Sequence, residues 1–218
     1  MRAIFIDRDG VINKDPGGWT EHSYVTDPKD LHILPGVIDA LKLLDRNNIK
    51  VIVISNQAGV SKGYFTKEML MRVTSKMLDE IGKKGARIEE VIYCMHRNED
   101  NCNCRKPKTG MLEKAIDKYN ISVRETFFVG DSEVDIIAGK RMGLKTVFVQ
   151  SGKATKDDVK KWQGKPDYVF NDLLSAVKWM LTKAKRRNDR AFKRTKNEGV
   201  REDGKVDPDS VCDSGDRA

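Results

Sequence analysis

The sequence predicts an α/β protein with a mostly parallel sheet. Short apolar segments alternate with amphipathic ones from residue 2 to about residue 180, which is the pattern of strands joined by crossover helices. Polar residues and glycines follow directly after three of the apolar segments, at residues 7–10, 55–63 and 130–135. Ligands of such sheets bind beyond the carboxyl ends of the strands, so we expect one functional cleft at this edge.

The first expected strand is the apolar run Ile4-Phe5-Ile6, followed by Asp7, Asp9 and Gly10. The run is short and rich in β-forming residues, and the glycine lets the chain turn away. Two close carboxylates repel each other unless a cation or a shared proton lies between them. The alternative is a strand-end turn with two solvated aspartates. A loop of residues 11–34 comes next, and long loops in this position are often functional.

The remaining elements alternate in order. A helix that opens at Pro35-Gly36 carries its apolar residues on a 3.6-residue period. Residues 50–54 form a strand that is apolar after Lys50, as in a parallel sheet covered on both faces. The resulting arrangement is three-layered and Rossmann-like, with helices on both faces of the sheet. Further helices are expected at 66–84, at 109–119, up to Met142 and at 172–183, and further strands at 88–95, 126–129, 145–149 and 168–170.

We expect two parts in the chain, a domain of residues 1–183 and a disordered tail of residues 184–218. The formal net charge is +8, but nearly all of the excess lies in residues 183–196. The body is close to neutral, so its charge gives no argument for nucleic-acid binding, and a solvated tail is the favoured interpretation. The first 18 residues are too charged for a signal peptide, and no apolar run approaches the ~20 residues that span a bilayer. We therefore expect a cytoplasmic protein without a membrane partner.

A cluster of metal-binding residue types lies in the middle of the chain: Cys94, His96, Cys102 and Cys104 fall within eleven residues. The fourth cysteine, Cys212, lies far from it. In a chain without a secretory signal, clustered cysteines more often bind a metal than form disulfides. Four protein ligands close a tetrahedral Zn²⁺ site, so this zinc would be structural and would pin its loop.

Two cations, Arg105 and Lys106, follow the cysteine cluster directly. Pinning the loop would also position them, and lysine suits a phosphate or carboxylate oxygen as a compact charge, whereas arginine offers a planar fork. A surface basic pair is the alternative.

A further carboxylate, Asp131, follows Gly130 at a strand end, with Asp135 one helical turn later as a supporting residue. Neighbouring parallel strands deliver their loops to one crevice, so Asp7, Asp131 and a main-chain oxygen near Asp9 could hold one Mg²⁺. A carboxylate nucleophile, a second carboxyl that moves protons, and cations that neutralise phosphate together indicate phosphoryl transfer.

These residues resemble the haloacid dehalogenase (HAD) superfamily over roughly residues 2–180. The resemblance implies a HAD-like fold in which Asp7 attacks the phosphorus atom and Asp9 is the general acid and base. It also implies that Ser55 and Lys106 hold the phosphate, and that Asp7, the Asp9 carbonyl and Asp131 hold Mg²⁺. The matching segments, in the family's order, are residues 4–10 for the nucleophile motif, Ser55 for the small hydroxyl residue, Lys106 for the motif lysine, and Gly130-Asp131 with Asp135 for the acidic motif.

The zinc loop running into Arg105-Lys106-Pro107 is similar to that of two subfamilies, the histidinol-phosphate phosphatases and the D,D-heptose 1,7-bisphosphate phosphatases. Both lack a cap domain and use Mg²⁺. Residues 56–63 and 108–112 look more like the heptose enzymes. In those enzymes, residues matching Asn56, Arg105 and Lys106 contact the substrate.

The resemblance therefore implies a Mg²⁺-dependent phosphatase that converts D-glycero-D-manno-heptose 1,7-bisphosphate to the heptose 1-phosphate through an aspartyl-phosphate intermediate. The expected partner is a small phosphorylated sugar and the expected state is a monomer. Histidinol phosphate or another small sugar phosphate is the alternative substrate. A more distant alternative is a non-catalytic phosphate-binding protein whose tail binds nucleic acid.

Overall fold

The sheet has six strands in the order β3-β2-β1-β4-β5-β6, and every neighbouring pair is parallel. The computed structural model describes the backbone of residues 2–198 and the side chains up to residue 185. The predicted α/β class and all six predicted strands are confirmed, with boundaries that shift by at most two residues. The strands are β1 (Ala3–Ile6), β2 (Lys50–Asn56), β3 (Glu90–Cys94), β4 (Phe127–Gly130), β5 (Lys145–Val149) and β6 (Tyr168–Phe170).

The helices connect these strands in alternation. Thr66 caps the second helix as expected, since its Oγ1 accepts a hydrogen bond from the backbone N–H of Met69 at 3.2 Å. No helix in the part of the chain that the structure describes is both long and apolar enough to cross a membrane. The α-helices are α1 (Val37–Arg46), α2 (Lys67–Lys83), α3 (Gly110–Tyr119), α4 (Glu133–Arg141), α5 (Lys156–Lys161) and α6 (Leu173–Glu198).

Three short helices are absent from the sequence prediction: α5 and the 3-10 helices η1 (Pro28–Asp30) and η2 (Val123–Glu125). None of the three contains a buried residue. Such segments have no periodic apolar face from which a helix could be predicted, because they form through local caps and turns. In α5, for example, Thr155 and Asp158 exchange the reciprocal hydrogen bonds of a capping box.

The last helix is longer than expected. We expected α6 to end near Lys183 and residues 184–218 to be disordered, whereas α6 runs to Glu198. Lysine, arginine and alanine are strong helix formers, which explains the extension. The chain divides into two units, Met1–Met180 and Leu181–Ala218. The predicted division into a domain of residues 1–183 and a tail stays a prediction. Residues 199–218, including Cys212, lie outside the described residues.

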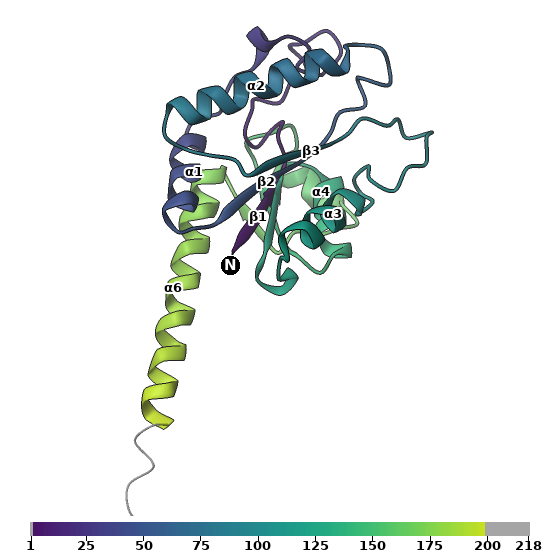
Figure 1. Ribbon diagram of the computed structural model, residues 1–218. Coiled ribbons are helices and arrows are strands. Elements are labelled where there is room, and N and C mark those ends of the chain that lie inside the picture. The colour runs from purple at the N-terminus through teal and green to yellow at the C-terminus, as the bar shows by residue number, and fades with distance from the viewer. Residues whose placement is uncertain (1, 199–218) are drawn as a thin grey trace, which may run out of the picture. The chain divides into compact units, whose positions relative to one another are not determined.

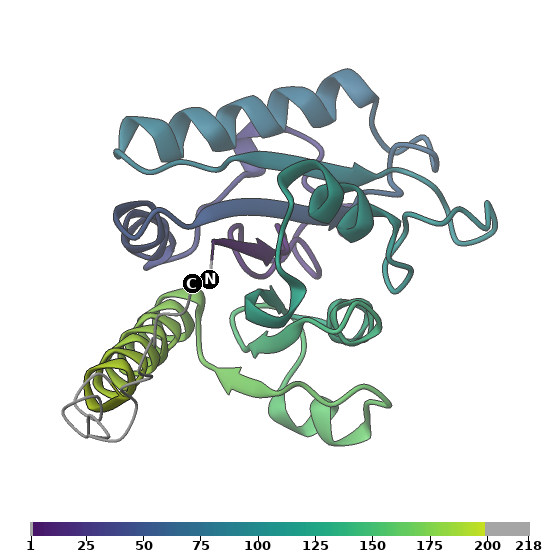
Figure 2. The same cartoon turned by 60° about the horizontal axis from the view of Figure 1, so that its bottom comes forward.

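Helices cover both faces of the sheet, with α1 and α2 on one side and α3 and α4 on the other (Figure 1). This follows from right-handed crossovers: β2 and β3 are added on one side of β1, and the chain then returns to add β4 and β5 on the other. Figure 2 shows the strands side by side in this order. The order reverses between β1 and β4, and the carboxyl ends of these two strands are where such sheets bind ligands.

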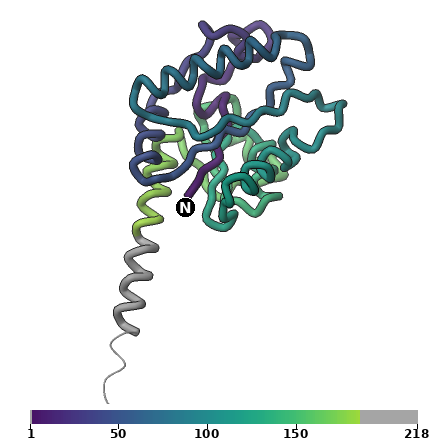
Figure 3. The backbone as a smooth tube through the Cα atoms, in the orientation of Figure 1, coloured from purple at the N-terminus to yellow at the C-terminus, as the bar shows by residue number. Residues whose placement is uncertain are grey.

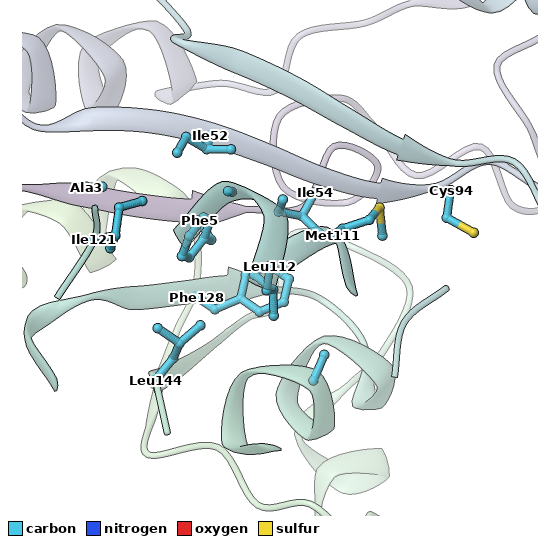
Figure 4. Packing of buried hydrophobic residues seen from close by; sticks show 12 residues of the cluster. Ala3, Phe5, Ile52, Ile54, Cys94, Met111, Leu112, Ile121, Phe128 and Leu144 are labelled. Carbon is cyan, nitrogen blue, oxygen red and sulfur yellow. The ribbon is translucent and has the colours of Figure 1, made fainter. Parts of the chain in front are cut away.

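The core fixes the register of β1. All four residues of β1 are buried, as expected for a central strand covered on both faces. Phe5 meets Phe128 of β4 edge to face, with ring centroids 6.4 Å apart, and lies in one layer with Ile54 and Leu112 (Figure 4). Each fully buried side chain of this size contributes about 1.5–3 kcal/mol. The strand therefore delivers Asp7 to a defined point at the sheet edge.

The long connection after β1 is an ordered flap, which we define as residues 11–34. It begins with two fully buried residues, Val11 and Ile12. Its η1 helix packs against α2, and the flap runs beside α2 in Figures 1 and 3. Tyr24 of the flap lies 5.8 Å from the ring of Phe65. The flap thus forms one wall above the carboxyl edge of the sheet.

Candidate active site

A cleft with a volume of about 560 Å³ opens at the carboxyl ends of β1, β2, β4 and β5. This size is typical of small-molecule sites. Flap residues and the loop after β5 contribute to its walls. The sequence-predicted residues that line it are Asp7, Asp9, Ser55, Asn56, Lys106 and Asp131.

Lys106 is the central cation of the cleft. Its Nζ lies 3.0 Å from Asp7 Oδ2 and 2.6 Å from Asp135 Oδ1, and it donates to the main-chain carbonyl of Ile54 at 2.8 Å. Burial alone would lower the pKa of Lys106, but the charges of Asp135 and Asp7 outweigh it and raise this pKa above its ordinary value. Lys106 is therefore a permanent charge at this point, although its side chain is almost completely buried.

Three carboxylates lie close together at the cleft, and two of them contact Lys106. Asp7, Asp131 and Asp135 each offer an oxygen within 4.8 Å of the others. Burial raises the pKa of Asp7 to about 7, and the charges of Asp135 and Asp9 also raise it, against the opposing effect of Lys106. Burial, Asp135 and Asp7 likewise raise the pKa of Asp131 well above its ordinary value. The cluster is short of positive charge, and its oxygen donors fit Mg²⁺.

Two glycines make room for the Asp131 carboxylate. A Cβ atom at Gly10 or at Gly152 would overlap this carboxylate. Gly10 also has a φ of +77°, a left-handed conformation that other residues adopt at a cost of about 1 kcal/mol or more. The two glycines therefore form a cradle of main chain around one predicted magnesium ligand.

Ser55 and Asn56 lie at the end of β2, as expected. The Asn56 side chain and the Lys106 main chain exchange two hydrogen bonds, from Nδ2 to the carbonyl and from the amide N–H to Oδ1, both 3.0 Å long. Asn56 thus ties the Lys106 backbone to the sheet. Ser55 is buried and its Oγ accepts a hydrogen bond from Gln57 Nε2 at 3.2 Å.

Asp9 is surrounded by donors. Its Oδ1 accepts hydrogen bonds from Arg8 Nε at 3.0 Å and from Asn13 Nδ2 at 3.1 Å. Its Oδ2 accepts from Arg8 Nη2 at 2.7 Å and from Gln57 Nε2 at 2.9 Å. Sequence reasoning missed all three donors, which are fully buried. The one available signal was Arg8 itself, because a charged residue directly after a buried strand needs a partner if it is buried.

The cysteine cluster has the geometry of a tetrahedral metal site. Cys94 Sγ lies 3.7 Å from Cys102 Sγ and 3.1 Å from Cys104 Sγ. His96 Nδ1 lies 3.6 Å from Cys94 Sγ and 3.2 Å from Cys104 Sγ. Tetrahedral zinc–sulfur bonds place two sulfur atoms about 3.8 Å apart. These cysteines form no disulfide, and burial raises the pKa of the Cys94 thiol, so a thiolate there needs a cation. The residues fit Zn²⁺.

The Arg105 side chain points toward the metal loop, whereas the Lys106 side chain points into the cleft. Arg105 Nε donates to Asn98 Oδ1 at 2.6 Å and its Nη1 to the His96 carbonyl at 3.5 Å, and it does not line the cleft. The guanidinium therefore braces the metal loop in this structure. A substrate contact by Arg105 stays a prediction.

Comparison with known proteins decides the family. The sequence model of the HAD-hydrolase-like family matches residues 103–176. The D-glycero-beta-D-manno-heptose-1,7-bisphosphate 7-phosphatase of Pasteurella multocida is 34% identical over 184 residues, which cover 81% of this chain and 95% of that protein. The corresponding enzyme of Haemophilus ducreyi is 35% identical over 189 residues, covering 82% and 98%. The chain belongs to the heptose-bisphosphate 7-phosphatase family of HAD-like hydrolases.

A solved structure supports this assignment to the heptose-bisphosphate phosphatases. The D,D-heptose 1,7-bisphosphate phosphatase from B. bronchiseptica, complexed with magnesium and phosphate, matches with a TM-score of 0.76 and 28% sequence identity. The match covers 84% of this chain and 99% of that one. The HAD-like fold predicted from the four motifs is therefore confirmed.

Within this family's cleft, replacing Lys106 by methionine is expected to lower kcat/KM for a phosphate monoester roughly 1,000-fold, because the cation aimed at the anionic substrate is lost. Urea unfolding should also show a loss of about 3–5 kcal/mol, because Asp7 and Asp135 are left as buried carboxylates without their partner. Lys108→Met is the matched control, since Lys108 is exposed on the same loop. Wild-type kcat/KM in Lys106→Met would contradict a phosphate-binding role.

Proposed function

We propose that this chain is a Mg²⁺-dependent phosphatase that removes the 7-phosphate of D-glycero-D-manno-heptose 1,7-bisphosphate and leaves the heptose 1-phosphate. The observation that carries the proposal is the buried contact between Asp7 and Lys106 beside Asp131, at the floor of the cleft. A carboxylate held against a cation, next to a site for a second cation, is arranged to meet a phosphate dianion.

The proposed chemistry has two steps. Asp7 forms a bond to phosphorus while the bond to the sugar oxygen breaks, and Asp9 gives its proton to that oxygen. Asp9 then takes a proton from the water that attacks phosphorus, and the bond from phosphorus to Asp7 breaks. Lys106 and Ser55 hold the phosphate oxygens throughout. Mg²⁺, when bound by Asp7, the Asp9 main-chain carbonyl and Asp131, supplies charge neutralisation for the phosphate.

The proposed substrate rests on the relatives, which are named as heptose-1,7-bisphosphate 7-phosphatases and match over most of their length. We further propose that the chain acts in the cytoplasm as a monomer on this small phosphorylated sugar, without a nucleic-acid or membrane partner. The division into a phosphatase domain of residues 1–183 and a tail remains part of this proposal.

The test is a panel of phosphorylated metabolites assayed with Mg²⁺ and with EDTA. We expect kcat/KM for the heptose bisphosphate to exceed that for histidinol phosphate roughly 100-fold or more, and we expect EDTA to remove the activity. The zinc loop is the one feature that favours the second candidate, histidinol-phosphate phosphatase. A higher kcat/KM for histidinol phosphate would replace the substrate proposal, and activity in EDTA would overturn the proposed role of Mg²⁺.

A further inference from the structure

We propose that Arg8 is a positioning residue that fixes the carboxylate of Asp9 in the cleft. The inference rests on the proposed function, because it concerns the group that protonates the leaving oxygen. It assigns a role to a residue that lies between the two catalytic aspartates in sequence but does not itself reach the cleft.

The contact is a two-point fork. Arg8 Nε donates to one oxygen of Asp9 at 3.0 Å and Nη2 donates to the other at 2.7 Å. Two parallel bonds fix both the place and the plane of a carboxylate, which a single bond does not. The Arg8 side chain is 0% exposed, whereas the Asp9 side chain keeps 17% of its surface open to the cleft. The two hydrogen bonds thus hold Asp9 from the buried side and leave part of its carboxylate accessible from the cleft.

The contacts of Arg8 indicate that it positions Asp9 rather than stabilises the fold. A buried ion pair is often no more stabilising than well-packed apolar residues, so burying a guanidinium is costly unless it secures a geometry. Arg8 Nη1 is buried without a hydrogen-bond partner in the described residues, and the ion pair of Arg8 is with Asp9. The Tyr93 ring lies 5.8 Å from Arg8 Cζ and backs the guanidinium with its π system.

Two amides complete the restraint. Asn13 Nδ2 and Gln57 Nε2 each donate to one oxygen of Asp9. Asn13 is itself held in the flap, since its Oδ1 accepts the His32 backbone N–H at 2.7 Å. Each oxygen of Asp9 therefore faces two donors from different segments. Arg8 is the member of this set that contacts both oxygens, so its loss should release the orientation of Asp9 most.

The test separates acid catalysis from folding by comparing two leaving groups. A primary sugar alkoxide needs a proton as it leaves, whereas p-nitrophenolate does not. We define the leaving-group ratio as kcat/KM for the heptose bisphosphate divided by kcat/KM for p-nitrophenyl phosphate. Both values scale with the fraction of folded enzyme, so the ratio does not depend on how well a variant folds.

Asp9→Asn sets the scale and should lower the leaving-group ratio roughly 100-fold or more. Arg8→Lys keeps the charge but not the fork, and should lower the ratio about tenfold, while Arg8→Met should lower it further. Arg87→Lys is the matched control. Arg87 also pairs with a carboxylate, with Nη2 2.7 Å from Glu89 Oε2, but on the exposed surface. It should leave the ratio unchanged.

A wild-type ratio in both Arg8→Lys and Arg8→Met, with a lowered ratio in Asp9→Asn, would overturn the positioning role. An unchanged ratio in Asp9→Asn would overturn the acid role of Asp9 and the inference with it. Failure of the substrate proposal is recognised separately, because the wild type would then hydrolyse p-nitrophenyl phosphate but not the heptose bisphosphate. The ratio would in that case be measured with the alkyl phosphate that the panel shows to be hydrolysed best.

Discussion

Asp7→Asn is expected to lower kcat for phosphate-ester hydrolysis roughly 10⁴-fold or more, because an amide cannot form the covalent bond to phosphorus that the proposed mechanism requires. The structure indicates that this variant removes the nucleophile and leaves the rest of the site in place. Asparagine has the shape of aspartate, and Asp135 remains in place to hold Lys106. The phosphate pocket should therefore persist without its nucleophile. Steady-state kinetics with Mg²⁺ measure the loss, and Asp117→Asn on the exposed side of α3 is the control.

The same variant should remain folded. The pKa of Asp7 is raised from its ordinary value of 3.8 to about 7 by burial. A carboxyl with a raised pKa in the folded state disfavours folding once it ionises, so its unfavourable contribution grows as the pH rises from about 4 to 7. Asparagine removes that contribution, and thermal unfolding above pH 7 without metal should show a midpoint equal to or above that of the wild type. Full activity in this variant would rule out Asp7 as the nucleophile.

Loss of the zinc site is the second large expected effect. Cys104→Ser should remove bound zinc and lower kcat/KM roughly 100-fold, because Cys104 lies two residues before Lys106 and a small displacement of a catalytic group is costly. Zinc would be measured by elemental analysis of the purified protein. Asn56 still holds the Lys106 backbone from the other side, so a partial rather than a complete loss is expected.

Metal add-back separates the two sites. Added Mg²⁺ should not restore the Cys104→Ser enzyme, since the defect lies in the position of Lys106 and not in the carboxylate cluster. Cys212→Ser provides a matched cysteine variant and should keep both zinc and activity. A zinc-free Cys104→Ser protein with wild-type kcat/KM would show that the loop needs no metal to place Lys106.

Topology explains why the floor of the site was predictable. Asp7 and Asp131 each follow an apolar strand, and the carboxyl ends of parallel strands meet at one edge, so the pattern brings them together without knowledge of any contact. Lys106 could be placed because a metal cluster directly precedes it. The Asp9 donors could not, because Asn13 and Gln57 reach Asp9 through side-chain directions that only the folded flap and the end of β2 determine.

The directions in which neighbouring side chains point could not be predicted from the sequence either. Arg105 and Lys106 form one basic pair in the sequence, yet Lys106 enters the cleft and Arg105 turns to the metal loop. The end of α6 was misjudged for a different reason. Apolar periodicity stops near residue 184, but the residues that follow have high helix propensity and α6 continues to Glu198.

The glycine cradle has a consequence for the choice of ion. Gly10 and Gly152 both lie directly against the Asp131 carboxylate, with no side chain of their own in between. Main chain cannot rotate aside as a side chain can, so it restricts the positions that the Asp131 carboxylate can take. Mg²⁺ is small and demands a near-ideal octahedron, whereas Ca²⁺ needs longer bonds and more ligands. A rigid backbone beside this ligand therefore suits the ion with the stricter geometry.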